Sequence, residues 1–227
     1  EPVGMNETFV YTPSAGHTKT EASGYGKFGE ISNYSGFTTG DAGIISTVTD
    51  LYKWDKALYT GKLVSRATLN KAFAPAKLNN GTTSPYGYGW MLKDENGEHL
   101  VYHTGGSGGF RTYIERQPDH HNTIIILTNM ENSPRVAIRN AIVNILANKP
   151  YTLPRISVAT EMYAIRNKSG IDSALAFYNS NKLKDTLIYD FAEQELNLLG
   201  YKLWSIKQIN EAIGVFKLNV AAYPKSS

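Results

Sequence analysis

Glycine divides this chain into two unlike parts. Seventeen of its 20 glycines and all 5 histidines fall within residues 1–149, and only three glycines lie in residues 150–227. Glycine-rich loops let the backbone approach a ligand closely, whereas glycine-poor helical sequence mostly packs. Pro150 and Pro154 stand at the division, where two nearby prolines end a helix and stiffen a linker. We therefore predict two domains, 1–149 and 150–227, with the chemistry in the first.

Composition excludes several classes of protein. The 227 residues are 41% hydrophobic and 19% charged, which is typical of a folded globular chain. The net charge is only +3 and no three basic residues are consecutive, so we expect no nucleic-acid partner. No stretch approaches the ~18 apolar residues that a membrane span needs, and no secretory signal opens the chain. The absence of cysteine excludes disulfides, thiolate metal sites and a cysteine nucleophile.

The first part is predicted to be an α+β fold, an antiparallel sheet with packing helices. Residues 1–45 show no clear period and are expected to be loops. A capping box at residues 47–50 begins a helix that Gly61 ends, and residues 66–73 form a second, shorter helix. Strand-like segments follow at residues 86–92, 100–104, 110–117 and 123–129. Ser133 and Pro134 begin a last helix, with a buried stripe predicted at Ile138, Ile142, Ile145 and Leu146.

The second part is predicted to be four helices. The last two match the spacing of a single tetratricopeptide repeat, in which small residues let two helices cross closely and large ones fill the gap. The matching residues are Leu196, Leu199, Gly200, Ala212, Phe216 and Pro224. A lone repeat cannot bury its apolar face, and the helices expected in residues 155–189 are candidates to cover it. An ordinary helical hairpin is the alternative interpretation of the same pattern.

The densest candidate site is the segment from His103 to Phe110, which holds four glycines in five residues between two predicted strands. A strand ending in glycines offers unobstructed backbone N–H groups, and such groups stabilise an oxyanion. A glycine-rich hairpin with nothing bound is the alternative, although a plain turn needs only one or two glycines.

Two patterns in the first part of the chain are misleading. Gly105 to Gly109 fit the G-x-S-x-G nucleophile elbow, but that elbow requires a helix after the serine, and the residues after Gly109 alternate as a strand. Ser107 is therefore not expected to be a nucleophile. His120 and His121 lie in a predicted turn with no carboxylate at metal-ligand spacing. No metal and no cofactor are expected.

Several segments together resemble one family. They occur in this order: residues 1–8, Gly40-Asp41-Ala42-Gly43-Ile44-Ile45-Ser46-Thr47, Asp50-Leu51, Trp54, Tyr86-Gly87-Tyr88-Gly89-Trp90, His103-Thr104-Gly105 and Gly109-Phe110. The combination resembles the C-terminal half of serine β-lactamase-related proteins, which include class C β-lactamases, low-molecular-weight penicillin-binding proteins, D-amino-acid peptidases and esterases. The resemblance covers about residues 1–147.

The resemblance implies a role for each residue of the glycine-rich segment. His103, Thr104 and Gly105 correspond to the family's third active-site motif, usually Lys-Thr-Gly, and Gly106 to a donor of the oxyanion hole. These four are the implied catalytic residues, and Ser107, Gly109 and Phe110 are implied to line the substrate site. Histidine in place of lysine replaces a fixed cation with a titratable group.

The family's other two motifs do not occur in the sequence. No serine is followed three positions later by lysine, and the nearest match to the Tyr-x-Asn motif, Tyr34-Ser35-Gly36, lacks the asparagine. We therefore expect that an upstream part of the protein carries the nucleophile. Two hypotheses follow: the C-terminal portion of a serine hydrolase acting on β-lactams, D-amino-acid peptides or small esters, inactive alone, or a non-catalytic docking domain.

The same resemblance implies a location and partners. The parent protein is expected to be bacterial and periplasmic or exported, with a small molecule or peptide as substrate. Without the family's N-terminal strands one sheet edge would be unpaired close to Ile124 and Leu127, and exposed edges recruit other chains. We therefore expect self-association, or association with an N-terminal fragment of the same protein.

Overall fold

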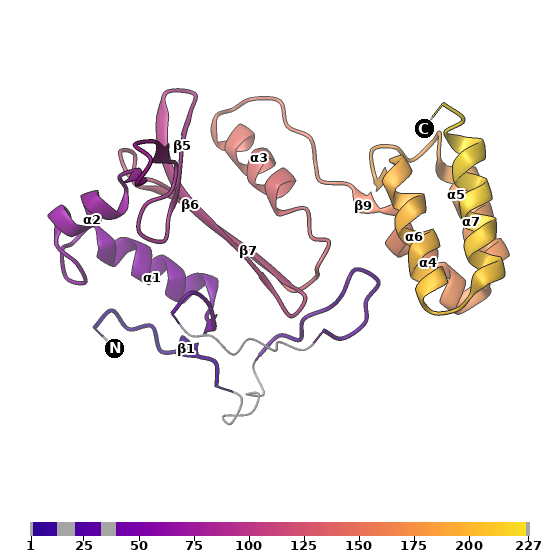
Figure 1. The fold of residues 1–227 in the computed structure, drawn as a ribbon, viewed down its shortest axis with the longest axis horizontal. Helices are drawn as coiled ribbons and strands as arrows, with labels where there is room; N and C mark the ends of the chain where they lie inside the picture. The colour runs from indigo at the N-terminus through magenta and orange to yellow at the C-terminus, as the bar shows by residue number, and fades with distance from the viewer. Residues whose placement is uncertain (1, 13–20, 33–39, 226–227) are drawn as a thin grey trace. The chain divides into compact units, whose positions relative to one another are not determined.

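The computed structural model describes residues 2–12, 21–32 and 40–225. Contacts divide the chain into two compact units, one made of Glu1–Gly26 and Ile31–Arg135, the other of Lys27–Glu30 and Val136–Ser227. Figure 1 shows the helices and strands of both units. The predicted domain limits at 149 and 150 remain a prediction. No helix among the described residues is long and apolar enough to cross a membrane.

A four-stranded antiparallel sheet forms the centre of the first unit (Figure 1). Its strands are β5 (Met91–Glu95), β6 (Glu98–Ser107), β7 (Phe110–Gln117) and β8 (Asn122–Thr128), and their spatial order follows the sequence. Two-residue turns join β5 to β6 at Asn96 and Gly97, and β6 to β7 at Gly108 and Gly109, all with positive φ. Such turns match the natural twist of paired strands, so the predicted antiparallel sheet is confirmed.

The first strand of the sheet begins later than predicted. Residues 86–90 were expected to be strand, but β5 starts at Met91. Gly87 packs so closely on the Ala72 carbonyl that a Cβ there would come closer than 3.0 Å, and Gly89 has φ +75°. Neither feature fits a regular pleated strand, so the segment forms a tight loop.

Helices α1 (Val48–Leu58) and α2 (Arg66–Ala72) begin at the predicted places. Thr47 caps α1 by accepting a hydrogen bond from the Asp50 backbone N–H. Trp54 of α1 stacks on Trp90 with ring centroids 5.9 Å apart, beside the buried Leu92 and Val101 of the sheet. The remaining strands of this unit are short pairs: β1 (Phe9–Val10) with β2 (Ile44–Ile45), and β3 (Ala76–Lys77) with β4 (Thr83–Ser84).

A buried ion pair also links α1 to the sheet. Arg116 of β7 is fully buried, and its Nε donates to Oδ1 of Asp55, which is 2% exposed. The Arg116 guanidinium also lies over the rings of Tyr59 and Phe73. Because neither charge reaches water, each depends on the other.

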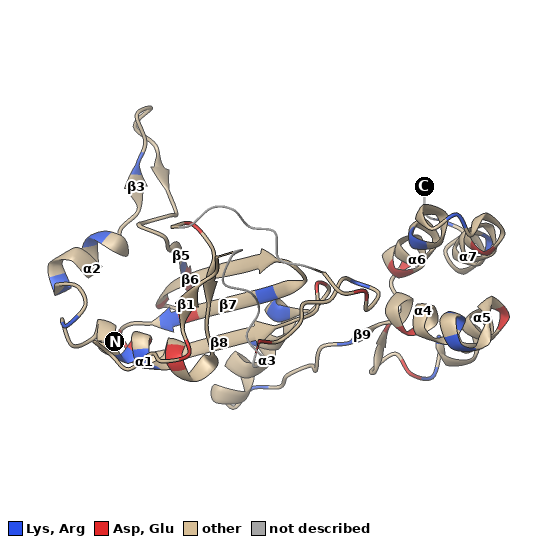
Figure 2. Ribbon diagram, turned by 90° about the horizontal axis from the view of Figure 1, so that it is seen from below, with Lys and Arg blue, Asp and Glu red and all other residues tan. Residues whose placement is uncertain are grey.

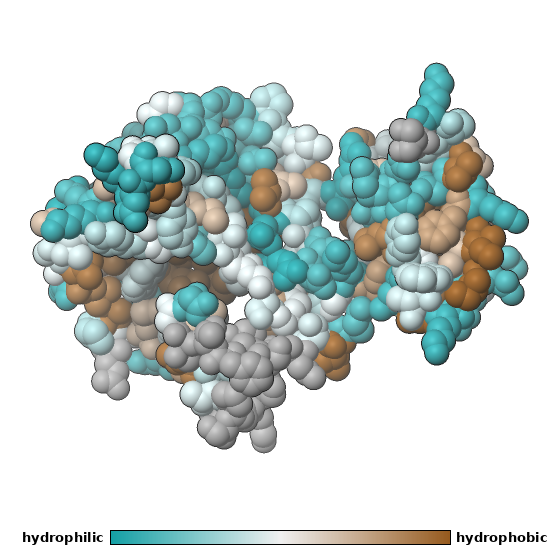
Figure 3. Space-filling model, viewed as in Figure 1, coloured by the Kyte–Doolittle hydropathy of each residue, from teal (hydrophilic) through white to brown (hydrophobic). Residues whose placement is uncertain are grey.

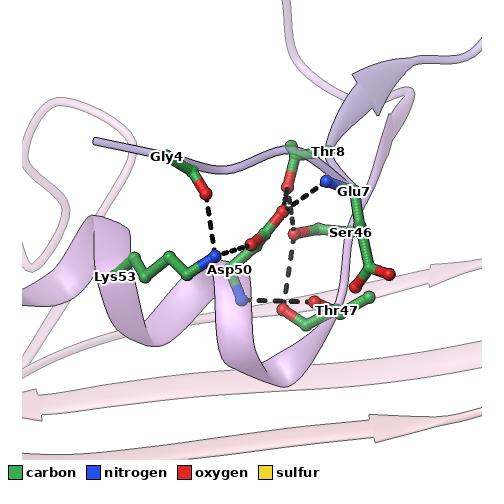
Figure 4. Close-up of polar contacts among 7 residues, drawn as sticks. All are labelled: Gly4, Glu7, Thr8, Ser46, Thr47, Asp50 and Lys53. Atoms are coloured by element: carbon green, nitrogen blue, oxygen red, sulfur yellow. Dashed lines mark hydrogen bonds and ion pairs between the residues drawn. The ribbon is translucent and has the colours of Figure 1, made fainter. Parts of the chain in front are cut away.

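Asp50 ties the start of the chain to α1 (Figure 4). Its side chain is 1% exposed, and it accepts from the Glu7 backbone N–H at 2.8 Å, the Thr8 hydroxyl at 3.0 Å and the Lys53 ammonium at 2.8 Å. The Lys53 ammonium also donates to the Gly4 carbonyl. The hydrogen bond from Lys53 is the main cause that holds the pKa of Asp50 below its ordinary value.

The second unit is helical. Its elements are α3 (Arg135–Leu146, which starts in the first unit), β9 (Ile156–Ser157), α4 (Val158–Ser169), α5 (Ile171–Asn181), β10 (Tyr189–Asp190), α6 (Glu193–Ser205) and α7 (Ile209–Ala222). The four predicted C-terminal helices are confirmed. They enclose a core that includes Met162, Tyr178 and Leu199, each fully buried. A Cβ on Gly200 of α6 would come closer than 3.0 Å to the Phe216 ring of α7, so this glycine permits the helices to approach closely.

The predicted buried stripe of α3 is wrong at its end. Ile145 is 51% and Leu146 is 71% exposed, whereas Arg139 and Ala141 are buried. A period of 3.6 residues identifies the apolar face of a helix, but it does not show where contact with a neighbour ends. Here the contact ends before the last turn.

Candidate active site

The predicted site residues lie on one hairpin. His103, Thr104, Gly105 and Gly106 occupy the second half of β6, Ser107 ends that strand, and Gly109 and Phe110 lead into β7. Ser107 pairs directly with Phe110 across the turn. The serine is therefore followed by a hairpin turn and not by a helix, which agrees with the rejection of a nucleophile elbow.

The second half of β6 has an open edge. β5 pairs with β6 only as far as Tyr102, and no other strand among the described residues lies beside residues 103–107 on that side. Ladder hydrogen bonds in an antiparallel pair alternate. Ser107 and Phe110 flank the two-residue turn and form a hydrogen-bonded pair. Because the hydrogen bonds alternate, the backbone groups of Gly106 and Thr104 point away from β7. The Gly106 N–H therefore faces the open edge.

Packing explains some of these glycines but not Gly106. A Cβ on Gly105 would come closer than 3.0 Å to the Thr112 hydroxyl, and one on Gly109 closer than that to the Tyr25 backbone. At Gly106 the three atoms nearest to a Cβ would all belong to the flexible Arg111 side chain, the first of them at 3.1 Å. Some glycines of the hairpin thus allow close packing, whereas Gly106 has an accessible backbone.

Neighbouring polar contacts hold the hairpin. The Arg111 guanidinium donates to the Phe110 carbonyl at 2.8 Å and forms an ion pair with Glu131 at 3.2 Å. The Thr128 hydroxyl donates to the Arg111 carbonyl at 2.7 Å. These contacts fix the tip of β6 and β7 and engage the cation that lies beside Gly106.

His103 makes two contacts through its ring nitrogens. Nδ1 lies 2.7 Å from the Thr104 carbonyl oxygen, and Nε2 lies 3.0 Å from the hydroxyl of Tyr86. The Tyr86 and His103 rings meet edge to face, with centroids 5.8 Å apart. Tyr86 was not among the predicted site residues. Tyr86 lies in residues 86–90, a segment of the family pattern, and this position could have identified it as a site residue.

The other histidines of the predicted turn serve separate contacts. Nε2 of His120 lies 2.8 Å from a Glu98 carboxylate oxygen, and the His121 ring stacks on Tyr59. The described parts of the chain hold no group of three or more potential metal-binding side chains. Tyr34, Ser35 and Gly36, the nearest match to the second family motif, lie outside the described residues.

The sheet with its packed helices is the fold of the β-lactamase and transpeptidase class. The Beta-lactamase family model matches residues 1–149, and the chain belongs to this family. It is 34% identical over 194 residues to penicillin-binding protein 4* of Bacillus subtilis (strain 168), covering 77% of this chain. The chain spans 42% of that relative's length.

Solved structures support the same fold. The octameric penicillin-binding protein homologue from Pyrococcus abyssi matches with a TM-score of 0.56 and 26% identity, over 74% of this chain and 40% of that one. The D-amino acid amidase from Ochrobactrum anthropi SV3, solved with D-phenylalanine, matches with a TM-score of 0.50 and 22% identity, over 65% of this chain and 50% of that one. The second likeness supports the fold alone.

Proposed function

We propose that the first unit forms one wall of the active site of a serine hydrolase that works through an acyl-enzyme. Its substrates are β-lactams, D-amino-acid peptides or small esters. The observation that carries the proposal is the open edge of β6, where the Gly106 N–H is free of the ladder to β7. A donor fixed on a strand edge stabilises the developing oxyanion without reorganising. Family membership and the penicillin-binding relative support the substrate class.

The other residues of the hairpin have subsidiary roles in this proposal. His103 borders the reacting group with its side chain, Thr104 faces it with its backbone groups, and Gly105 leaves room for the Thr112 side chain of β7. Ser107, Gly109 and Phe110 bound the substrate beyond the oxyanion. The serine nucleophile and its lysine are supplied by residues outside these 227, because no serine here is followed three positions later by lysine.

The test uses the chain with and without a separately expressed Ser-x-x-Lys segment from the same gene. Alone, the chain should form no adduct with a fluorescent penicillin and should not turn over nitrocefin or a p-nitrophenyl ester. With the segment, an adduct should appear on the segment's serine. A stoichiometric adduct on a serine of this chain, Ser107 included, would overturn the proposal.

A matched pair of variants tests Gly106 in that assembly. Gly106→Pro removes the N–H and should lower turnover by ~10²–10³-fold, as for the loss of one oxyanion donor. Gly106→Ala keeps the N–H, and the atoms nearest to its Cβ would belong to the flexible Arg111 side chain, so turnover should fall far less. Equal turnover in both variants would show that Gly106 does not face the reacting carbonyl.

A second candidate function is non-catalytic docking, through a tetratricopeptide-like pair formed by α6 and α7. The supporting observation is an apolar surface along α7, where Ile213 is 46% and Val220 is 71% exposed (Figure 3). Basic and acidic residues are mixed over both units (Figure 2), which favours a partner without a strong charge of one sign. For the parent hydrolase we also propose a bacterial, periplasmic or exported location, and for this chain self-association.

A further inference from the structure

The contact between Tyr86 and His103 carries an inference that rests on the proposed function and deepens it. Tyr86 lies in the loop before β5. His103 is the first residue of β6 beyond the part that pairs with β5. Loop and strand meet because Tyr86 forms a bridge with Met91, and Met91 in turn pairs with Tyr102. The Tyr86 hydroxyl is thereby brought to the beginning of the open edge.

The hydrogen-bond partners fix which nitrogen of His103 carries hydrogen. The Thr104 carbonyl can only accept, so the Nδ1 that lies 2.7 Å from it must donate. In the neutral ring Nε2 is then an acceptor, and the group 3.0 Å away that can donate to it is the Tyr86 hydroxyl. Each nitrogen of the ring is thus assigned to a protein partner.

We infer that Tyr86 is a positioning residue for His103, and that the two side chains form a hydrogen-bonded pair at the open edge of β6, in which the neutral ring carries its hydrogen on Nδ1. Tyr86 fixes the ring's orientation and its Nδ1–H form. Because the Tyr86 hydroxyl directs its hydrogen to Nε2, its oxygen can only accept a further hydrogen bond. Tyr86 is 37% exposed.

The Tyr86–His103 pair affects which substrate group fits at the open edge of β6. A lysine at position 103 would present a fixed cation suited to a free carboxylate. The Tyr86–His103 pair instead presents an acceptor, which suits an N–H donor such as a carboxamide. Among the proposed substrates, the pair therefore favours an amide over a carboxylate in the substrate group that contacts Tyr86.

The direct test is nitrogen NMR of the chain labelled with ¹⁵N-histidine. The His103 signals are assigned through their loss in His103→Gln. In the neutral ring of the wild type we expect hydrogen on Nδ1 and none on Nε2. In Tyr86→Phe the Nε2 signal should move and the two nitrogen signals should approach each other, because one contact that fixes the form is lost. Tyr88→Phe changes an exposed neighbour in the same loop and should leave both signals unchanged.

Each outcome of this test is decisive. Hydrogen on Nε2 in the wild type, or identical spectra of Tyr86→Phe and wild type, would overturn the pairing. Catalysis is not measured, so failure here is distinct from failure of the proposed hydrolase.

The substrate consequence is tested by titrating the same sample with N-acetyl-D-alaninamide and with N-acetyl-D-alanine, which differ only in amide against carboxylate. The amide should shift the His103 signals and the acid should not. Equal shifts with both compounds, or with neither, would overturn the amide preference and leave the pairing intact.

Discussion

At the scale of single residues, the glycines of the hairpin separate into two kinds. A Cβ on Gly105 would collide with the Thr112 hydroxyl and one on Gly109 with the Tyr25 backbone, whereas the atoms nearest to a Cβ on Gly106 belong to a flexible side chain. The sequence predicted the whole segment as a site but could not make this distinction, because Tyr25 is far away along the chain. Tyr86 was missed for the same reason: its contact with His103 depends on the loop that Gly87 and Gly89 impose.

Gly109→Ala and Gly97→Ala form a matched pair that tests the packing role. Both glycines have φ near +80°, at +81° and +83°, but an added Cβ would meet nothing at Gly97 and the Tyr25 backbone at Gly109. Gly97→Ala should lower the free energy of unfolding by about 1–2 kcal/mol, from the backbone conformation alone. Gly109→Ala should lose a further ~1–3 kcal/mol through the collision. Urea denaturation measures both, and equal losses would show that residue 25 does not pack on the hairpin.

At the scale of elements, the sequence pattern predicted well whether a segment is a helix or a strand, and predicted less well which residues contact other elements. The predicted strand at residues 110–117 agrees with β7, and α1 begins at its predicted cap, because alternation and capping are local. Two errors came from contacts that are not local. The Ala72 carbonyl forces the loop before β5, and Ile145 and Leu146 in the last turn of α3 are exposed.

The attachment of α1 to the sheet is expected to depend on Asp55. Asp55→Ala leaves the Arg116 charge buried without its carboxylate, and breaking such a pair costs about 3–5 kcal/mol. Asp119→Ala removes an exposed carboxylate from a turn and should change stability by less than ~0.5 kcal/mol. Thermal and urea unfolding measure both variants. A loss below ~1 kcal/mol in Asp55→Ala would contradict the buried pair.

The contacts of Asp50 with Glu7 and Thr8 are expected to stabilise the fold to a degree that depends on pH. The folded pKa of Asp50 lies below the ordinary value of 3.8, so its contribution is fully present above that value and is lost as pH falls through the folded pKa. Asp50→Asn should therefore lower Tm at about pH 6, and the difference from wild type should narrow below about pH 4. Asp119→Asn is the control. A Tm difference that stays constant down to about pH 2 would contradict the assignment.

At the scale of the whole molecule, the chain leaves apolar surface uncovered in each unit. β8 pairs only with β7 among the described strands, and its Leu127 is 36% exposed. In the helical unit Trp204 is 61% and Val220 is 71% exposed. Family membership and the helical second part were predictable from sequence, because the motifs and the glycine contrast extend over long segments. The partner that covers these surfaces could not be predicted, because the exposure of apolar residues does not show what binds to them.

We expect the chain to self-associate at ~10–100 µM, a range in which such surfaces associate. Sedimentation should then give a mass above the 25.1 kDa of one chain. Leu127→Lys should reduce association if β8 mediates it, and Val220→Lys if α7 does. A single species of 25.1 kDa with cooperative unfolding would show that both surfaces are stable in water.

The open edge of β6 also sets how its amides behave in heavy water. Residues 103, 105 and 107 direct their N–H groups into the ladder with β7, whereas Thr104 and Gly106 direct theirs outward. Hydrogen exchange along this strand should consequently alternate, fast at Thr104 and Gly106 and slow at residues 103, 105 and 107. A ligand or a neighbouring chain segment that occupies the edge would slow the two fast amides alone. The exchange rate of Gly106 is therefore a direct measure of whether its site is filled, and it can be read without any chemical turnover.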